Sequence, residues 1–326
     1  MGKKIIAFGG GRRNSNSEVY LKEALMAAEE MGCEVELIRL NDCDLHPCKS
    51  CRIQMCWKNG GDICPLKGDD TWWLVDKFLD SDGFLMAAPV FSLAPASVVS
   101  VFRDRVMGSK MDHVGHELFG FEPEFIKGRA KARPGGLISV GGAGTEHWTS
   151  LGLPTLFTTT FSAQIEIVDH MNVHGIANPG AATLNEEYLA HARRIGQNVA
   201  YSVLHPAEHY SWMGDEKEGV CPGCHLGLLL VKPQGNDVIC SVCGRHGKAI
   251  IENNQIVRYE FVENDPDDRL TPAGKATHAR ETMYILEHNF KPYEQEVAKR
   301  MEKYTNYKDI ITLPPSKTKK KEQTNG

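Results

Sequence analysis

The sequence predicts an α/β protein with a doubly wound, five-stranded parallel sheet, followed by a small four-cysteine module and C-terminal helices. Two observations predict the sheet. Short apolar runs alternate with amphipathic segments of helical length, and glycine-rich turns follow the first and fourth of these runs. A third observation predicts the module: two pairs of closely spaced cysteines lie beyond residue 215.

The composition limits the class of protein. The 326 residues are 41% hydrophobic and 24% charged, which is ordinary globular usage and excludes a wholly disordered or collagen-like chain. The formal net charge of −5 argues against nucleic acid as a partner. No apolar run approaches the roughly 20 residues that span a bilayer, so no membrane association is expected. Residues 1–11 start a strand rather than a signal peptide, and we expect a cytoplasmic protein.

The predicted elements alternate strictly along the chain. The strands are residues 4–8, 34–40, 83–88, 136–140 and 164–168. The helices are residues 16–31, capped by Asn16 or Ser17, then 69–79, 96–106, 145–159 and 184–204. Five strands alternating with helices fit a flavodoxin-like arrangement, which binds ligands at the carboxyl ends of its strands.

Three regions follow from changes in character along the chain. Residues 1–210 form the α/β domain and include a cysteine-rich loop at 41–68. Residues 217–262 combine four cysteines with short alternating segments, which is typical of a small metal-stapled module. Residues 263–326 are a helical extension, broken at Pro292, that ends in a disordered basic tail.

The turn after the first strand is a candidate phosphate loop. Glycines let backbone amides approach an anion, and the N-terminus of the following helix favours negative charge. The candidate contacts are Gly10, Arg12, Asn14, Ser15, Asn16 and Ser17. The alternative interpretation is an ordinary strand–helix turn with a capping residue.

Two later turns add to this pattern. Residues 88–92 (Ala-Pro-Val-Phe-Ser) follow the third strand, and residues 140–146 (Val-Gly-Gly-Ala-Gly-Thr-Glu) follow the fourth. Together with the first loop they resemble the NADPH-dependent FMN reductase and iron–sulfur flavoprotein family, of flavodoxin-like fold, over about residues 3–205. Gly10 and Gly11 depart from that family's pattern, which often has Ser and Pro there.

The resemblance implies a site for FMN. The phosphate would lie at Arg12, Ser15, Asn16 and Ser17. The isoalloxazine would lie near Pro89, Val90, Phe91 and Ser92, with Gly141, Gly142 and Gly144 on its other side. A flavin ring needs a flat apolar slot with backbone donors at its polar edge, which these residue types can supply.

The first cysteine group lies in the loop after the second strand. Its members are Cys48, Cys51, Cys56 and Cys64. Four thiolates this close together can hold a [4Fe–4S] cluster or a tetrahedral zinc ion, and free or redox-active thiols are the third interpretation. The group resembles the compact motif of the iron–sulfur flavoproteins, with two extra residues between its second and third cysteines, and this resemblance favours the cluster.

The second cysteine group is two C-x₂-C pairs separated by fifteen residues. It consists of Cys221, Cys224, Cys240 and Cys243. Two such knuckles form a four-cysteine metal site, as in a zinc ribbon or a rubredoxin. Structural zinc is favoured over rubredoxin-type iron, because His225 and Ser241 stand where rubredoxins usually have glycine and proline.

Several histidines are weaker candidates. His170 and His174 follow the predicted fifth strand, where a proton-transfer role and a structural role are both open. His147 and Trp148 begin the segment after the third loop. They either face the ligand pocket or serve as surface and packing residues.

The sequence thus predicts an FMN-dependent oxidoreductase. Electrons would pass between NAD(P)H or a reduced ferredoxin and a small-molecule acceptor, through FMN and a [4Fe–4S] cluster. One alternative is a simple NAD(P)H:flavin or quinone reductase whose cysteine loop holds structural zinc. The other is a non-enzymatic electron carrier or binding protein. The family resemblance also implies a homodimer or homotetramer.

Overall fold

The computed structural model describes residues 2–51, 64–120, 122–232 and 235–307. The chain divides into two compact units, Met1–His278 and Ala279–Gly326. Within the described residues, no helix has the length and apolar character needed to cross a membrane.

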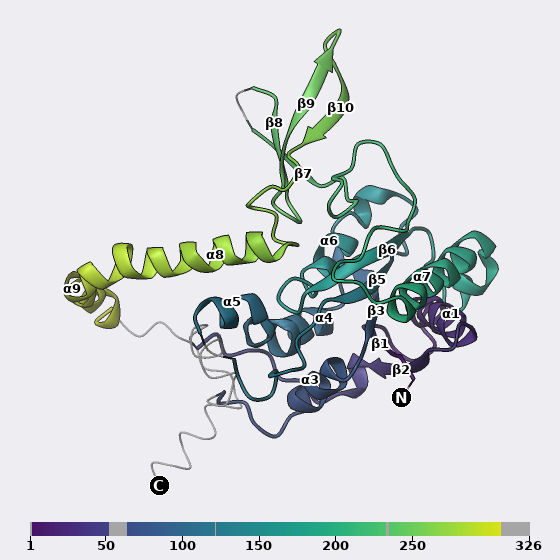
Figure 1. Cartoon of the computed structure of the whole chain (residues 1–326), viewed down its shortest axis with the longest axis horizontal. Coiled ribbons are helices and arrows are strands. Elements are labelled where there is room, and N and C mark those ends of the chain that lie inside the picture. Colours follow the sequence, from purple (N-terminus) through teal and green to yellow (C-terminus); the bar gives the residue numbers. More distant parts are fainter. Residues whose placement is uncertain (1, 52–63, 121, 233–234, 308–326) are drawn as a thin grey trace. The chain divides into compact units, whose positions relative to one another are not determined.

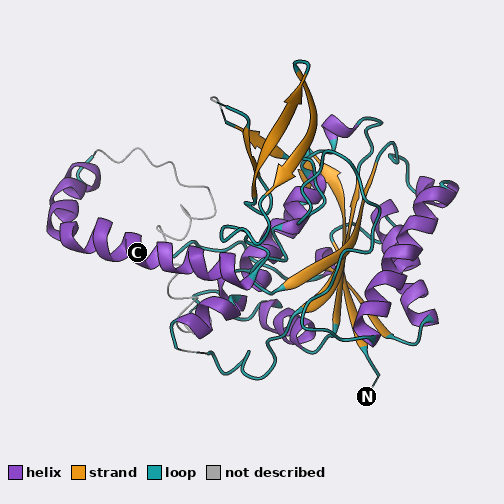
Figure 2. Ribbon diagram, turned by 45° about the horizontal axis from the view of Figure 1, so that its top comes forward, coloured by secondary structure: helices purple, strands orange, loops and turns teal. Residues whose placement is uncertain are grey.

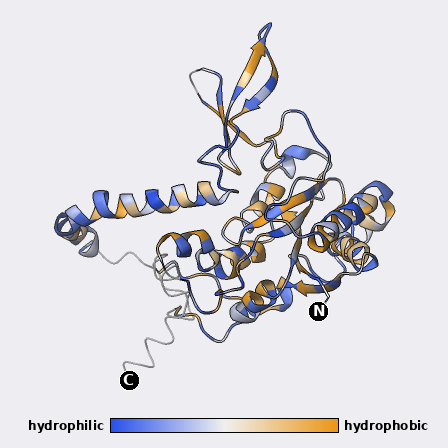
Figure 3. Ribbon diagram, in the orientation of Figure 1, coloured by the Kyte–Doolittle hydropathy of each residue, from blue (hydrophilic) through white to orange (hydrophobic). Residues whose placement is uncertain are grey.

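The first unit is built on a parallel sheet with the order β2-β1-β3-β5-β6 (Figures 1 and 2). The strands are β1 (Lys4–Gly9), β2 (Glu34–Arg39), β3 (Gly83–Phe91), β5 (Arg133–Val140) and β6 (Ile165–Val173). A two-residue strand, β4 (Ala94–Pro95), turns back antiparallel to the end of β3. The order confirms the predicted doubly wound, flavodoxin-like fold. β1 and β3 are hydrophobic along most of their length (Figure 3), and β5 is buried throughout.

Helices cover both faces of this sheet (Figure 2). On one face, α1 (Asn16–Glu30) and α7 (Glu186–Leu204) pack against apolar residues of the central strands. On the other face lie α3 (Thr71–Leu79), α4 (Ser97–Phe102) and α6 (Gly152–Phe157). A Cβ on Gly196 of α7 would lie 1.9 Å from the carbonyl oxygen of Ala24, so α1 and α7 can approach closely only with glycine there.

Two helical segments differ from the prediction. The helix expected over 145–159 is instead a 3₁₀ helix, Glu146–Trp148, followed by the shorter α6. The helix expected over 96–106 is α4 continued by a π-helix, Arg103–Met107. Close packing accounts for the placement of α6, because a Cβ at Gly152 would lie 2.1 Å from Ser139 Oγ. In the sequence, the short α5 (His113–Leu118) lies between the π-helix Arg103–Met107 and β5.

The four-cysteine module forms a second, antiparallel sheet. Its strands are β7 (Leu229–Val231), β8 (Asp237–Cys240), β9 (His246–Glu252) and β10 (Gln255–Phe261), in the order β10-β9-β8-β7. Beyond it, α8 (Pro272–Tyr284) continues as a π-helix, Ile285–Phe290. A 3₁₀ turn, Lys291–Tyr293, separates this from α9 (Glu294–Thr305), so the predicted break at Pro292 is confirmed.

Candidate functional site

A cavity of about 620 Å³ lies at the carboxyl ends of β1, β3, β5 and β6. The predicted cofactor residues that line it are Gly10, Arg12, Ser15, Asn16, Ser17, Pro89, Val90, Phe91 and Gly142. Residues far apart in the sequence therefore meet where an open α/β sheet binds its ligands. Asn14, Ser92, Gly141 and Gly144 do not line this cavity.

The first loop presents hydroxyls at the N-terminus of α1. Ser15 caps the helix, its Oγ accepting from the backbone N–H of Glu18 at 3.3 Å. Its Oγ lies 3.1 Å from that of Ser17, and Arg12, an exposed residue of the same loop, lines the same cavity. Asn14 takes a left-handed conformation, with φ of 57°, that turns the chain into the helix. Hydroxyls, an arginine and a helix N-terminus together fit a phosphate group.

Gly11 keeps the space above these hydroxyls open. A Cβ at this position would lie 2.3 Å from Ser15 Oγ and 2.6 Å from Ser17 Oγ. Glycine at this position therefore leaves an open space next to the two hydroxyls, which an alanine side chain would fill and which we call the cradle. The departure from the family pattern at Gly11 thus widens access to the two serine hydroxyls.

Asn16 has a different role from the one predicted. Its amide nitrogen donates to the carbonyl oxygens of Ile176 at 3.2 Å and Asn178 at 2.8 Å, and its Oδ1 accepts from the N–H of Ala182. The side chain is therefore fully used in tying α1 to the loop after β6. Only its backbone N–H is left for a phosphate.

A buried ion pair fixes the start of α1 against β2. Glu18 is 2% exposed and accepts from Arg39 at 2.6 and 3.1 Å and from Lys22 at 2.7 Å. Burial acts to raise the pKa of this carboxyl, but the hydrogen bonds from Arg39 and Lys22 outweigh it and lower the pKa to about 2. The phosphate-loop helix is thus held by a carboxylate that stays ionised.

The second loop forms a tight hairpin that exposes an aromatic ring. Val90 and Phe91 pair with Pro95 and Ala94, and the turn between them places Ser92 and Leu93 at φ of 48° and 74°. Two successive non-glycine residues in the left-handed region of backbone conformation carry local strain of the kind found at functional sites. Phe91 is 64% exposed, so its ring is available to a flat ligand.

The glycines of the third loop have separate roles. Gly142 lines the cavity opposite Ala177. Gly141 instead packs on Thr149, whose Cγ2 would lie 2.1 Å from a Cβ at this position. The residues that the sequence prediction missed are Asn41, Ala96, Ser97, Val98, Val140, Ile176, Ala177 and Pro179. The loop at 176–179 leaves the carboxyl end of β6, so the topology alone could have indicated it.

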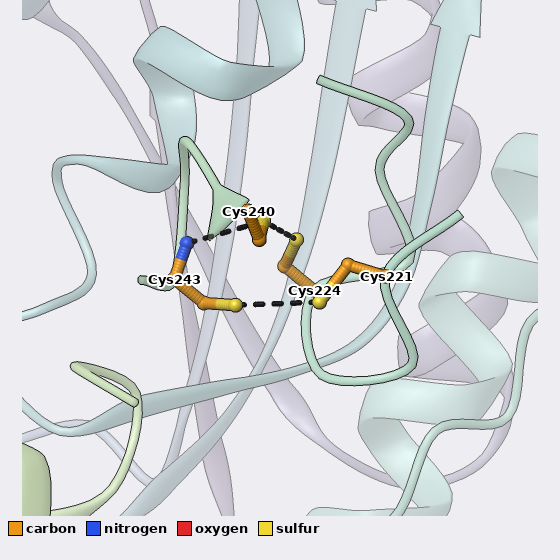
Figure 4. A group of neighbouring side chains, drawn as sticks. All are labelled: Cys221, Cys224, Cys240 and Cys243. Atoms are coloured by element: carbon orange, nitrogen blue, oxygen red, sulfur yellow. Dashed lines mark hydrogen bonds between the residues drawn. The ribbon is translucent and has the colours of Figure 1, made fainter. Parts of the chain in front are cut away.

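The four cysteines of the second group form a compact cluster that could hold a metal ion (Figure 4). Their sulfurs all lie within 4.8 Å of one another, and each cysteine is at most 1% exposed. Tetrahedral Zn–S bonds of about 2.3 Å would space the sulfurs about 3.8 Å apart, which fits this arrangement. The N–H of Gly223 points at Cys221 Sγ and that of Cys243 at Cys240 Sγ, as expected where a thiolate accepts from its knuckle.

The first cysteine group lines a second cavity, of about 510 Å³. Cys48, Cys51 and Cys64 line it, and Cys56 lies outside the described residues. Arg105, only 3% exposed, donates to Cys64 Sγ at 3.2 Å and forms an ion pair with Asp69 at 2.5 Å. Arg105 also lines this cavity, so a cysteine sulfur and a buried cation paired with Asp69 lie together in its wall.

His170 is a structural residue. It lies within β6, packs between Phe157 and Trp212, and donates its Nε2 hydrogen to the carbonyl oxygen of Cys224 at 3.1 Å. Burial lowers its pKa to about 4. The ring therefore ties the metal knuckle to the parallel sheet, which argues against the proton-transfer role considered for it.

Comparison with known proteins finds the family that the sequence resembles. Residues 3–150 match the family of NADPH-dependent FMN reductases. A flavone synthase of Aspergillus candidus is 26% identical over 269 residues, 75% of this chain and 77% of that protein. An iron–sulfur flavoprotein of Methanocaldococcus jannaschii is 27% identical over 206 residues, 60% of this chain and 95% of that protein.

A solved structure extends the likeness to nearly the whole chain. A flavone reductase superposes with a TM-score of 0.74 at 26% identity, covering 95% of this chain and 99% of that one. The fold, the cavity and these matches define a flavin-dependent oxidoreductase. The chain is thus similar to NADPH-dependent FMN reductases over residues 3–150, and to an iron–sulfur flavoprotein and a flavone reductase over a larger part of its length.

Proposed function

We propose that the chain is an FMN-dependent reductase that passes electrons from NAD(P)H or a reduced ferredoxin to a flat, unsaturated organic acceptor. The observation that carries this is the cavity at the strand ends. Its wall contains both the open space above the Ser15 and Ser17 hydroxyls and the exposed ring of Phe91. When bound, FMN would supply the hydride and single-electron chemistry. The names of the flavone synthase and flavone reductase relatives support a flavone-like acceptor.

The chain's own residues would bind and orient the reactants. Ser15 and Ser17 would donate to the phosphate, and Arg12 would neutralise part of its charge. Pro89, Val90 and Phe91 would form the apolar wall beside the ring. These residues would bind and orient the cofactor through their position and charge, without transferring a proton.

We also propose a [4Fe–4S] cluster at Cys48, Cys51, Cys56 and Cys64, with zinc at the second group. When bound, the cluster would relay single electrons. The buried guanidinium of Arg105 beside Cys64 supports an anionic centre there. The four tightly grouped, buried sulfurs of the second group support a single metal ion.

We also propose an oligomer. Among the described residues, the cysteine cavity and the strand-end cavity have no lining residue in common. A homodimer or homotetramer, in which the cysteine loop of one subunit approaches the flavin of its neighbour, would bring the two centres together. Mass photometry of the purified protein tests this, and a monomer would contradict it.

The test of function starts with anaerobic purification and quantitation of flavin, iron, sulfide and zinc. About four iron and four sulfide per chain, with FMN and one zinc, supports the proposal. FMN with two zinc and no sulfide overturns the cluster and leaves a plain flavin or quinone reductase. Five iron and no zinc would assign rubredoxin-type iron to the second group.

Measurement of acceptor turnover then distinguishes an enzyme from a non-enzymatic electron carrier. With NADH, NADPH or reduced ferredoxin as donor, we expect repeated reduction of menadione and of a flavone. Reduction of the bound flavin without turnover of any acceptor would favour the electron-carrier alternative.

A further inference from the structure

One edge of the four-stranded sheet is open to a further strand. The sheet order is β10-β9-β8-β7, so β10 pairs with β9 on one side, and no strand among the described residues lies on its other side (Figure 1). Its sequence, QIVRYEF, contains neither proline nor lysine, the residues with which natural proteins commonly block such an edge. An edge of this kind presents backbone donors and acceptors that can extend the sheet.

The hydrogen bonds to β9 show which residues of β10 direct their backbone outward. The N–H of Val262 donates to the carbonyl oxygen of His246 at 2.9 Å. In an antiparallel pair, every second residue points its N–H and carbonyl at the neighbouring strand. The register is regular from Arg258 to Phe261, so Arg258 and Glu260 point their backbone at β9 like Val262, and the residues between them point away.

The hydrogen bonds on the far side of β9 agree with this for Tyr259. Tyr259 lies opposite Ala249 of β9. The N–H of Ala249 donates to the carbonyl oxygen of Asn236 at 2.7 Å, and its carbonyl oxygen accepts from the Asn236 side chain at 2.7 Å. Both backbone groups of Ala249 are thus used on the side away from β10, and those of Tyr259 face the open edge.

The charges of β10 are complementary to those of a second copy of the same strand. Arg258 and Glu260 flank Tyr259, and both are exposed and joined by an ion pair at 2.7 Å. When a second β10 runs antiparallel with the two Tyr259 residues opposite each other, each Arg258 stands opposite the partner's Glu260. Opposite charges that face each other across two strands stabilise the pairing.

Other registers lack this match. A two-fold axis at Phe261, the other outward-facing residue of the regular segment, would set Glu260 opposite Val262 and Arg258 opposite Asn264. Parallel, in-register pairing would set like charges opposite each other at both positions, which is destabilising. The charges therefore favour one antiparallel register, with its axis between them.

Apolar side chains flank the same segment. Ile256, Val257 and Val262 are each about half exposed, at 53%, 49% and 48%. Exposed apolar residues that are grouped together mark interaction sites, whereas single ones need no explanation. A neighbouring strand would remove part of this surface from water and so add a hydrophobic contribution to the backbone hydrogen bonds.

We propose that two copies of the chain associate through their β10 strands, antiparallel and centred on Tyr259, so that two four-stranded sheets become one continuous sheet. The four-cysteine module then serves subunit assembly. Cys240 is the last residue of β8, so a metal ion at the cysteines would hold the sheet that presents the pairing edge. The inference goes beyond the proposed function, since pairing requires neither FMN nor an electron donor.

The first test is charge reversal in the full-length holoprotein, followed by sedimentation equilibrium. R258E sets like charges opposite each other twice across the two-fold axis, so the Kd of self-association should rise at least about tenfold, a difference of ~1.4 kcal/mol. The double variant R258E/E260R restores opposite charges and should restore the Kd. An unchanged Kd in R258E would overturn the proposal.

The matched control for charge reversal is R300E on α9. Arg300 is also an exposed arginine in an ion pair with a glutamate of its own element, Glu296 at 2.7 Å. R300E changes the net charge as R258E does and should leave the Kd unchanged. An equal rise in both variants would make net charge the cause and would count against pairing at β10.

The second test locates the contact by cross-linking. Residues opposite each other in a hydrogen-bonded antiparallel pair have Cα atoms about 5.5 Å apart, a distance that a disulfide spans. Y259C should therefore form a covalent dimer in oxidised glutathione, with the 259–259 link identified by peptide mass spectrometry. In V257C the two new thiols lie opposite residue 261 rather than each other, so this variant should behave like the wild type. Absence of the 259–259 link would contradict the register.

The outcome is separable from that of the proposed function. FMN content and acceptor turnover report on the oxidoreductase activity alone. An oligomer that R258E leaves intact and that Y259C does not cross-link is held together by another surface, and then only the pairing at β10 is wrong. A cross-linked dimer that binds no flavin and turns over no acceptor would keep the pairing and overturn the proposed function.

Discussion

The guanidinium of Arg105 donates a hydrogen bond to the sulfur of Cys64 at 3.2 Å. Arg105 lies in the π-helix Arg103–Met107, which continues α4, and the side chain is 3% exposed. Its second partner is Asp69, 2% exposed and 2.5 Å away, and a third is the hydroxyl of Thr71 at 2.9 Å. One buried cation therefore joins the cysteine loop to the N-terminus of α3.

Replacing Arg105 with methionine is expected to destabilise the protein by about 3–5 kcal/mol, because it leaves the Asp69 carboxylate buried without its partner. Urea unfolding at neutral pH measures this. The double variant R105M/D69N removes both charges and should recover part of the loss. If the single and double variants were equally stable, the ion pair would not be the cause.

Glu18 gives a pH dependence whose sign follows from its lowered pKa. The folded-state pKa of about 2 lies below the ordinary value of 4.5, so the stabilisation by Arg39 and Lys22 is fully present above about pH 4.5. It is lost as the pH falls toward 2. The difference in unfolding free energy between wild type and E18Q should reach up to ~3 kcal/mol at pH 7 and shrink steadily below pH 4.5. A constant difference across that range would contradict the assignment.

Removal of metal from the second cysteine group should unfold the module locally and leave the flavin in place. Cys240→Ser is expected to lose this metal and to raise amide hydrogen exchange in β8 and β9, since metal ligation supplies much of the folding energy of a small module. None of the described residues that line the strand-end cavity belongs to the module, so FMN content should persist. Cys33→Ala, which removes a buried thiol outside both groups, is the control.

The fold was predictable because each strand and helix carries its own local pattern. The apolar runs at 4–8 and 83–88 are signals within a few residues of sequence, whereas the helix cap expected at Asn16 or Ser17 is Ser15 in the structure. The single helix expected over 145–159 is instead a 3₁₀ helix followed by α6, because the course of this segment depends on distant packing. Gly152 lies against Ser139 of β5, a contact that periodicity does not encode.

The sequence predicted where the loops of the candidate site lie better than it predicted what each residue does there. The three loops were placed correctly at the strand ends, since topology brings them together. Asn16 and Gly141 were assigned to cofactor binding, but one ties α1 to a loop 160 positions along the chain and the other packs on Thr149. Such roles depend on which side chains arrive from elsewhere in the fold.

The cradle above Ser15 and Ser17 gives the most direct test of the cofactor site. In the variant G11A, the added Cβ would lie 2.3 Å from Ser15 Oγ and 2.6 Å from Ser17 Oγ, in the space that a phosphate would use. FMN should then bind at least about tenfold more weakly, a loss of ~1.4 kcal/mol or more. Titration of the apoprotein with FMN, followed by quenching of flavin fluorescence, measures the Kd.

The matched control is G144A in the third loop, because a Cβ at this position meets no atom within 4 Å. The same addition of one methyl group should leave the Kd for FMN unchanged there. Riboflavin, which lacks the phosphate, separates the two parts of the site: its weaker binding should be the same in G11A and in the wild type. If G11A weakened riboflavin and FMN equally, the methyl group would act through the ring pocket, and the phosphate would have to lie elsewhere.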